Sequence, residues 1–264
     1  MRGIDQLCGL PLSPFRRGSV ALYHIGRCGS SVLGNLLDQH PAIRWDREIY
    51  FHRWTRSNRQ LERWDSEGFL RRSMWAAGRR YYGFEVKFLD SQNLLTLQLS
   101  LADYIAELTR VGVTHHVVLE RRNTLRVMVS SAAGTRNKRY HAATDAPAGP
   151  VERVRLDVAR WKFWKHTEPK PLVDCLADVS ASYAELRRLL AGQTVLELSF
   201  EDDIAAESPH AAYSRTCEFL ELPPAPAEVH TRRLHPEPLS ALIENFEEVA
   251  AALRGTPYEW MLAD

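Results

Sequence analysis

One stretch near the N-terminus constrains the fold more than any other part of the sequence. An apolar run over residues 20–25 leads into the turn Gly26-Arg-Cys-Gly-Ser-Ser31, after which apolar residues return at helical spacing. A tight, glycine-containing turn between a strand and a helix directs several backbone N–H groups, and the positive end of the helix dipole, at one point. The stretch therefore predicts an anion site, suited to a phosphate group, between the first strand and the first helix.

The rest of the chain alternates between short apolar runs and segments with helical periodicity. Candidate strands lie at residues 20–25, 82–88, 116–119 and 195–200, and apolar helical stripes at 94–108, 172–190 and 239–253. This alternation is typical of a parallel sheet that is covered by helices. The predicted fold class is α/β, with three layers and a central, mainly parallel sheet flanked by helices.

The composition is that of an ordinary globular chain. Of its 264 residues, 45% are hydrophobic and 25% are charged, which argues against a disordered or fibrous structure. The length suits one large core, so we expect a single domain over residues 1–264. A formal net charge of +1 gives no reason to expect a nucleic-acid or membrane partner.

No segment has the pattern of a signal peptide or of a transmembrane helix, which needs about 18 apolar residues. A soluble, cytoplasmic protein is therefore expected, and nothing in the sequence indicates its oligomeric state. The cysteines lie far apart and form no C-x-x-C pair, which argues against a disulfide framework or a zinc site. We expect reduced, mostly buried thiols at Cys8, Cys28, Cys175 and Cys217.

The glycine-containing turn differs from the usual ATP-binding P-loop. The motif G-x-x-x-x-G-K-[ST] has a lysine directly before the hydroxyl residue, whereas this chain has Gly29-Ser-Ser31. The loop lacks that lysine, and no strand clearly ends in an acidic residue that could bind a metal. The loop is therefore poorly suited to bind a triphosphate with magnesium. A metal-free phosphate donor is favoured. The alternative is an ordinary strand–helix turn with Ser30 as its N-cap.

Basic residues also follow the third candidate strand. Arg122 lies eight residues before Ser130, so a strand-end arginine and a serine two turns into the next helix could reach one further phosphate. This pair predicts a second anion site. Arg121 and Arg126 fit better as members of a solvated charge cluster.

Several motifs in order along the chain resemble the PAPS-dependent sulfotransferases, especially their bacterial carbohydrate-type branch. The resemblance spans roughly residues 20–262 and rests on Gly26-Arg-Cys-Gly-Ser-Ser31, Gly83-Phe-Glu-Val-Lys-Phe88, Leu119-Glu-Arg-Arg-Asn-Thr-Leu-Arg-Val-Met-Val-Ser130, Leu198-Ser-Phe-Glu-Asp-Asp203, Leu242-Ile-Glu-Asn-Phe-Glu-Glu-Val249 and Leu253-Arg-Gly-Thr-Pro-Tyr258. It implies a P-loop-like α/β fold whose donor lies along the carboxyl ends of the strands, where open α/β sheets bind ligands.

The same resemblance implies roles for individual residues. The 5′-phosphosulfate end of 3′-phosphoadenosine 5′-phosphosulfate (PAPS) would be held by Arg27, Cys28, Gly29, Ser30, Ser31 and Val32. Arg122 and Ser130 would hold the 3′-phosphate, and no metal is implied. Glu201 and Asp202 look like the acidic turn of the family, which would cap the helix that begins near Ser208.

Sulfuryl transfer to an alcohol needs a base for the hydroxyl proton and positive charge beside the bridging oxygen. Arg27 suits the second role. Glu48 is the candidate base, because the carbohydrate-type enzymes often carry a Gly-Glu-hydrophobic segment at this position. Arg47 stands where their glycine often stands, so Asp46 and His52 are kept as alternatives.

Three nearby features have two interpretations each. Glu48 could instead form surface ion pairs with the neighbouring arginines. Lys87, at the end of the second candidate strand, could contact the acceptor or the donor sulfate, or be an ordinary solvated lysine. The aromatic residues Trp45, Tyr50, Phe51 and Trp54 could line the acceptor site or belong to the core.

The expected acceptor is a hydroxyl-bearing small molecule, a carbohydrate or a glycolipid-like compound. The segments 45–80 and 136–150 lack regular patterns and are expected to face it. The arginines of the first segment hint at an anionic acceptor. Two other functions stay open: a P-loop nucleotide kinase or hydrolase, and a catalytically silent nucleotide-binding protein.

Overall fold

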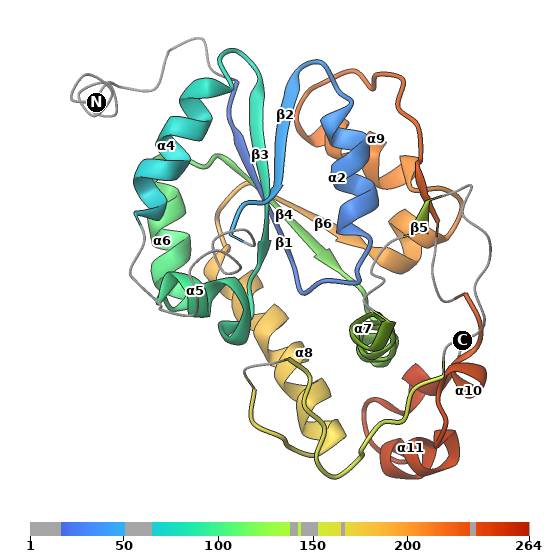
Figure 1. The fold of residues 1–264 in the computed structure, drawn as a ribbon. Helices are drawn as coiled ribbons and strands as arrows, with labels where there is room; N and C mark the ends of the chain where they lie inside the picture. The colour runs from blue at the N-terminus through green and yellow to red at the C-terminus, as the bar shows by residue number, and fades with distance from the viewer. Residues whose placement is uncertain are drawn as a thin grey trace.

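The computed structural model describes residues 17–50, 65–137, 142–143, 153–164, 167–232 and 236–263. A five-stranded sheet in the order β2-β3-β1-β4-β6 forms its centre, and every neighbouring pair of strands in it is parallel. The strands are β1 (Ser19–His24), β2 (Ile43–Glu48), β3 (Tyr81–Lys87), β4 (His115–Glu120) and β6 (Val195–Ser199). Their carboxyl ends therefore share one edge of the sheet, the lower edge in Figure 1.

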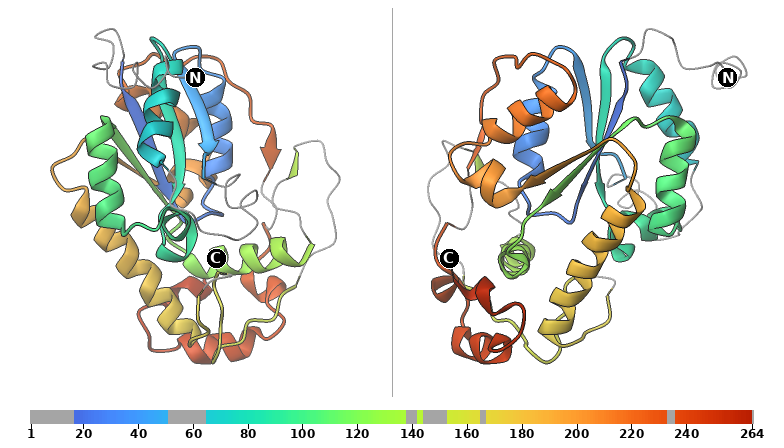
Figure 2. Two further views of the ribbon diagram at one scale, coloured as in Figure 1. Left: turned by 60° about the vertical axis from the view of Figure 1, so that its left-hand side comes forward. Right: turned by 180° about the vertical axis from the view of Figure 1, so that it is seen from behind.

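Helices cover both faces of this sheet, as the opposite views in Figures 1 and 2 show. The long helices are α2 (Ser30–Asp38), α4 (Ser66–Ala76), α6 (Leu101–Val111), α7 (Thr124–Asn137), α8 (Leu172–Leu189) and α9 (His210–Phe219). α2 and α9 lie on one face and α4 and α6 on the other, while α7 and α8 lie toward the carboxyl edge. The predicted three-layer α/β fold is confirmed.

The central strand shows why the sequence folds in this way. All six residues of β1 are fully buried, because helices cover the sheet on both sides. A parallel strand in that position reads as an almost continuous apolar run, which is the pattern that residues 20–25 carry. The other three predicted strands correspond to β3, β4 and β6.

The segment 45–80, predicted to be irregular, contains regular structure instead. Its first residues complete β2, the edge strand, and its later residues form α4. In β2, Ile43 and Trp45 are buried while Arg44 and Asp46 are partly exposed, so one face of the strand packs on the core. Residues 51–64 lie outside the described residues, as does most of the segment 136–150.

Two of the predicted helices are interrupted. The stripe over 94–108 is divided among a π-helical turn, η1 (Asp90–Leu94), the short α5 (Leu95–Leu97) and α6, because Gln98 adopts a left-handed φ of 55°. The stripe over 239–253 is divided into α10 (Leu239–Leu242) and α11 (Phe246–Leu253), with Ile243 extended between them. Ile243 forms a parallel bridge with Val154, which explains the break.

The remaining elements are β5 (Ala142–Ala143), which pairs with β7 (Thr231–Arg232), and the short helices η2 (Phe200–Ala205) and η3 (Glu259–Leu262). A second apolar cluster, separate from the core of the sheet, joins α7, α8, α10 and α11 through buried leucines such as Leu125, Leu172 and Leu239. This cluster holds the first turns of α7 against the C-terminal helices, so it fixes the helix that carries Ser130.

Within the described part of the chain, none of the helices combines the length and the apolar character needed to cross a bilayer. Cys28, Cys175 and Cys217 are free, buried thiols, as the sequence predicts. Cys8 lies outside the described residues.

Candidate functional site

The loop between β1 and α2 has the backbone of an anion cradle. Gly26, Arg27 and Gly29 have left-handed φ angles of 89°, 58° and 88°. The first intrahelical hydrogen bonds are donated by the N–H groups of Val32 and Leu33 to the carbonyl of Gly29, so the N–H groups of Ser30 and Ser31 precede them. The N-cap is Gly29 and has no side-chain capping bond. The expectation that Ser30 is the N-cap of an ordinary strand–helix turn is therefore wrong about the N-cap.

The loop leaves no room for a side chain at Gly29. A Cβ atom there would lie 2.9 Å from Ile204 Cγ2 and 3.2 Å from Phe200 Cδ2, and the left-handed φ also favours glycine. The backbone of the loop thus packs directly on η2, which follows β6. This close packing fixes the start of α2 relative to the strand at the far side of the sheet.

Cys28 points away from the cradle. Its side chain is fully buried, and its thiol donates to the carbonyl of Gly26 at 3.0 Å. Burial raises the pKa of the Cys28 thiol, and a hydrogen bond, the nearby charge of Arg121 and Tyr183 only partly offset this effect. Of the predicted donor-binding residues, Cys28 can therefore contribute only its backbone.

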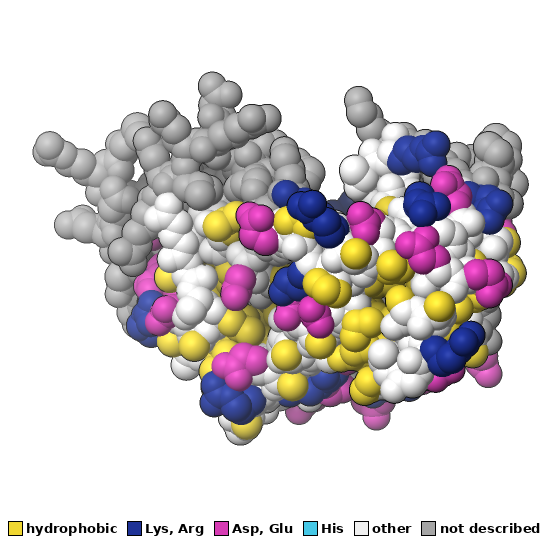
Figure 3. Space-filling model, turned by 90° about the horizontal axis from the view of Figure 1, so that it is seen from below, with side chains coloured by type: hydrophobic (Ala, Val, Ile, Leu, Met, Phe, Trp, Pro, Cys, Tyr) yellow, Lys and Arg dark blue, Asp and Glu magenta, His cyan; other side chains and the backbone are white. Residues whose placement is uncertain are grey.

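Arg27 connects the loop to α7. Its Nε donates a hydrogen bond of 3.0 Å to the Oγ of Ser130. From the end of β4, Arg121 Nη1 donates to the carbonyl of Arg27 at 3.3 Å. The two predicted anion sites are thus in contact with each other through an arginine and a serine at the carboxyl edge of the sheet. Figure 3 shows the surface of the molecule on this side, seen from below.

Arg122 stands at the same edge, but its side chain turns toward η2. Its Nη2 lies 2.7 Å from Asp202 Oδ1, and Nε lies 3.7 Å from Glu201 Oε2. Glu201 also accepts hydrogen bonds from the backbone N–H groups of Arg122 and Asn123. The expectation that this acidic pair caps a helix near Ser208 is wrong, because Glu201 caps the turn that enters α7.

Arg121 and Arg126 are buried, which contradicts their interpretation as a solvated cluster. The guanidinium of Arg121 stacks 4.2 Å from the ring centroid of Phe200. Arg126 Nη2 donates to the carbonyl of Glu237 at 3.1 Å. Both arginines hold loops together at the carboxyl edge. Their burial depends on neighbours that are distant in the sequence, so the local sequence could not predict it.

Glu48 and Lys87 form an ion pair beside the loop. Glu48 Oε2 lies 2.7 Å from Lys87 Nζ, and each side chain is 26% exposed, so the pair stays accessible. A Cβ atom on Gly26 would lie 3.5 Å from Lys87 Cε, which places the lysine against the cradle. Of the two alternative bases, Asp46 pairs with Arg44 at 3.2 Å, and His52 lies outside the described residues.

A β-bulge sets the direction of Glu48. The register of β2 on β3 shifts between Trp45 and Glu48, which then pairs with Glu85. Within the bulge Arg47 has a left-handed φ of 48°. This conformation favours glycine, so an arginine at this position holds a strained backbone.

A buried polar group lies beneath the loop and was missed by the sequence analysis. His24 Nδ1 accepts a hydrogen bond from the N–H of Gly26 at 3.0 Å, so the ring proton is on Nε2, which lies 3.3 Å from Glu85 Oε2. Glu85 Oε1 accepts from Trp45 Nε1 at 3.1 Å. The available signal was a histidine and a glutamate inside strands that are otherwise apolar.

The ligand-type atoms of His24, Glu48 and Glu85 lie within 4.8 Å of one another, a spacing that could hold a metal ion. At this point the ammonium group of Lys87 already forms an ion pair with the carboxylate of Glu48. The imidazole Nδ1 is also occupied by the N–H of Gly26. The arrangement is therefore that of an ion-pair network which supports the loop.

The charge state of Glu85 follows from its neighbours. Burial alone raises its pKa, but the neighbouring imidazole of His24, the Trp45 hydrogen bond and the charge of Lys87 together bring the pKa below the ordinary value. Glu85 is thus a buried carboxylate that depends on its partners. A carboxylate of this kind stabilises the fold at neutral pH and loses its contribution as the pH falls through its lowered pKa.

We predict that Glu85→Gln lowers the free energy of unfolding by about 3 kcal/mol at pH 7, as expected when one partner of a buried pair is removed. His24 and Trp45 face different oxygens of Glu85, so in glutamine the NH2 group would face one of these two N–H groups. Urea unfolding at pH 7 and at a pH below the lowered pKa of Glu85 measures the change. The loss should shrink in acid, where the wild-type carboxylate is protonated. Glu185→Gln, an exposed glutamate paired with Arg188, is the control and should change little. Equal stability of the Glu85 variant and the wild type would contradict this role.

Comparison with protein-family models and with curated proteins finds no match. Among solved structures, the crystal structure of a sulfotransferase from Alicyclobacillus acidocaldarius is similar to this chain. The TM-score is 0.49 and the identity 15%, over 91% of this chain and 93% of that chain. A likeness at this level assigns no activity.

Proposed function

We propose that the protein is a sulfotransferase that moves a sulfuryl group from PAPS to a hydroxyl group of an acceptor. One observation carries the proposal: Arg27, in the cradle after β1, is hydrogen-bonded to Ser130 in α7. Two anion-binding features that are far apart in the sequence therefore meet at one edge of the sheet. An adenosine with one phosphate on the 3′ and one on the 5′ position of its ribose fits this pairing. A ligand with a single phosphate chain needs only the first loop.

The described residues fit such a donor. Ser30 and Ser31 offer backbone N–H groups at the start of α2 to the 5′ end, with Arg27 and Val32 beside them. Ser130 offers a hydroxyl to the 3′-phosphate, and Arg122 stands at the same edge. Its exposed pair with Asp202 is the kind of surface ion pair that contributes little, so a phosphate can replace the carboxylate as its partner.

When bound, PAPS supplies a sulfuryl group whose bond to the 5′-phosphate breaks as the acceptor oxygen bonds to sulfur. Glu48 accepts the hydroxyl proton of the acceptor, a role that its exposure permits. Lys87 holds Glu48 in place and brings an ammonium group next to the loop. Arg27 places a second positive charge where negative charge develops on the bridging oxygen.

The same contacts weigh against a nucleotide kinase or hydrolase. The loop has no lysine before Ser30, and the acidic residue at the end of β4, Glu120, is bound by Arg187. A magnesium ion would need a carboxylate at that place. The remaining rival, a silent nucleotide-binding protein, differs from our proposal only in lacking transfer, which the Glu48 variant below addresses.

We expect 3′,5′-phosphoadenosine bisphosphate (PAP) to bind without metal and more tightly than ATP with magnesium. Arg122→Ala should weaken the binding of PAP by about tenfold to a hundredfold, because charge-assisted hydrogen bonds to the 3′-phosphate are lost. Isothermal titration calorimetry with and without EDTA measures both effects. Arg155→Ala, which removes a comparably exposed arginine paired with Glu248, is the control and should bind PAP normally. A preference for ATP with magnesium would overturn the proposal.

Glu48→Gln should cut the rate of sulfuryl transfer by roughly 10² to 10⁴ and leave the dissociation constant of PAP unchanged. The amide keeps the shape of the side chain but cannot take the proton. Transfer of label from ³⁵S-PAPS to a panel of phenols, sugars and glycolipids gives the rate. Asp46→Asn, two residues away and paired with Arg44, is the control and should be as fast as the wild type. Full activity of the Glu48 variant would mean that another residue is the base. If the wild type transfers label to none of the acceptors, a catalytically silent nucleotide-binding protein is favoured.

A further inference from the structure

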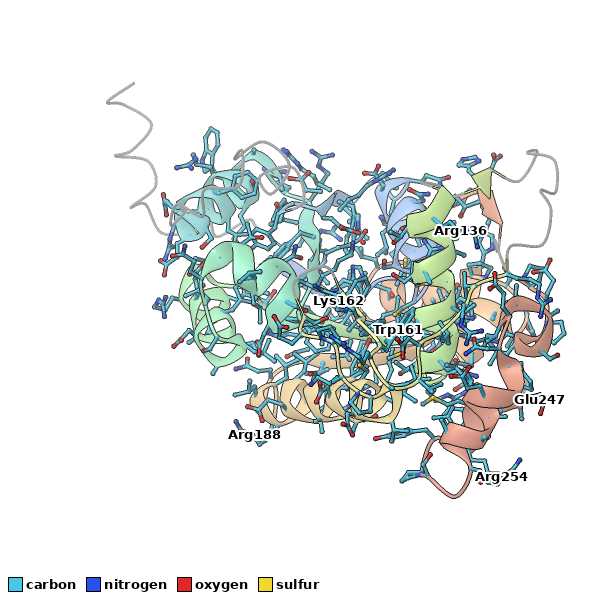
Figure 4. The ribbon with its side chains drawn as sticks, turned by 60° about the horizontal axis from the view of Figure 1, so that its bottom comes forward. Arg136, Trp161, Lys162, Arg188, Glu247 and Arg254 are labelled. Atoms are coloured by element: carbon cyan, nitrogen blue, oxygen red, sulfur yellow. The ribbon has the colours of Figure 1, made fainter. Side chains whose placement is uncertain are left out.

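A cavity of about 660 Å³ lies beside the candidate site. Its walls come from the end of β3 and η1, the start of α6, one side of α8 and, from the segment that begins at Phe163, the residues Phe163, Trp164, Thr167 and Glu168. The chain that leads into this segment, with Trp161 and Lys162, runs across the underside of the molecule in Figure 4. A volume of this size is typical of a site for a small organic molecule.

The cavity adjoins the cradle through one aromatic ring. Trp164 lines the cavity, and its Cη2 would lie 3.8 Å from a Cβ atom on Gly26. Lys87 Cε would lie 3.5 Å from the same Cβ atom, and Phe88, the next residue along the chain, is also in the cavity wall. A molecule in the cavity therefore lies next to the point where Lys87 and Glu48 meet the loop.

The walls of the cavity combine aromatic and hydroxyl groups. Phe88, Phe163 and Trp164 provide apolar surface, and the rings of Phe163 and Trp164 lie with their centroids 4.6 Å apart. Ser91 and Thr167 add hydroxyl groups. Such a lining suits a molecule with an apolar ring and a few polar substituents.

Among the described residues that line the cavity, acidic side chains outnumber basic ones. The acidic side chains are those of Asp90, Glu168, Asp178 and Glu185, and the basic side chain is that of Lys170. Lys170 is bound to Asp178, and Glu185 is bound to Arg188 outside the cavity. Asp90 and Glu168 have no ion-pair partner among the residues that the structure describes. The field of these described residues therefore favours a cation and opposes an anion.

We propose that this cavity is the acceptor site and that it takes a hydroxyl compound with an apolar ring and an ammonium group. The inference rests on the proposed sulfotransferase function. The ring packs on Phe163 and Trp164, the ammonium group faces Asp90 and Glu168, and the hydroxyl group reaches Glu48. In the reaction the acceptor oxygen bonds to sulfur, the sulfur–oxygen bond to the 5′-phosphate breaks, and the proton goes to Glu48. A sulfate ester and PAP are the products.

This assignment differs from the hint in the sequence. The arginines of the segment 45–80 suggested an anionic acceptor, and several of them lie in residues 51–64, outside the described residues. The arginines of α4, by contrast, lie on the flank of the sheet, away from the carboxyl edge (Figure 1). The cavity next to the loop thus has the opposite charge from the one that the composition of the segment suggests.

Three phenols that differ only in charge test the proposal: tyramine, 4-ethylphenol and 3-(4-hydroxyphenyl)propionate. With PAPS as donor, we expect kcat/KM to fall in that order, by about threefold to tenfold from the cation to the neutral phenol, as for charges several ångströms apart near a protein surface. Asp90→Asn combined with Glu168→Gln should remove the preference. Ala102→Trp, which fills the cavity, should lower kcat/KM for all three phenols at least tenfold.

The dissociation constant of PAP is measured for every variant, and it should stay at the wild-type value, which also shows that each variant is folded. Asp174→Asn removes an exposed carboxylate of α8 that does not line the cavity, so it should keep the preference. Failure of the wild type to bind PAP would overturn the proposed function. Normal binding of PAP with no transfer to any of the three phenols, a preference for the carboxylate, or full activity of Ala102→Trp would overturn the cavity assignment alone.

Discussion

The parallel pairing of β1 on both of its edges is the constraint on which the site depends. His24, the last residue of β1, is in register with Lys87 at the end of β3, and Tyr23 is in register with Val118 of β4. The loop after β1 therefore emerges between the ends of two neighbouring strands. Groups from β2, β3, β4 and α7 can converge on it only because all of these strands run in the same direction.

The backbone conformation of the loop after β1 costs free energy. Arg27 has a left-handed φ, which for a residue other than glycine costs on the order of 1 kcal/mol or more. The contacts that hold it come from three directions: His24 below, Arg121 from β4 and Ser130 from α7. The buried carboxylate of Glu85 orients His24 in turn. The shape of the cradle thus depends on its own glycines and the local contact of His24, and also on the long-range contacts of Arg121 and Ser130.

The sequence predicted those parts of the structure that depend on local patterns. The central strands and the glycine-containing loop carry such patterns, and so do the stripes of the long helices. The edge strand was missed because a bulge with Arg47 interrupts its pairing, and a helix was predicted too long because Gln98 turns the backbone. The burial of Arg126 and the direction of Arg122 depend on partners more than 70 residues away, Glu237 and Asp202. No local pattern could indicate them.

Two pockets for negative charge at neighbouring strand ends, close enough to share one ligand, are the centre of this interpretation. A crystal structure of the protein with PAP tests it most directly. We predict the 5′-phosphate at the N–H groups of Ser30 and Ser31, and the 3′-phosphate between Ser130 and Arg122, with Arg122 released from Asp202. A bisphosphate bound away from this edge, or one that leaves Ser130 and Arg122 without contact to either phosphate, would contradict it.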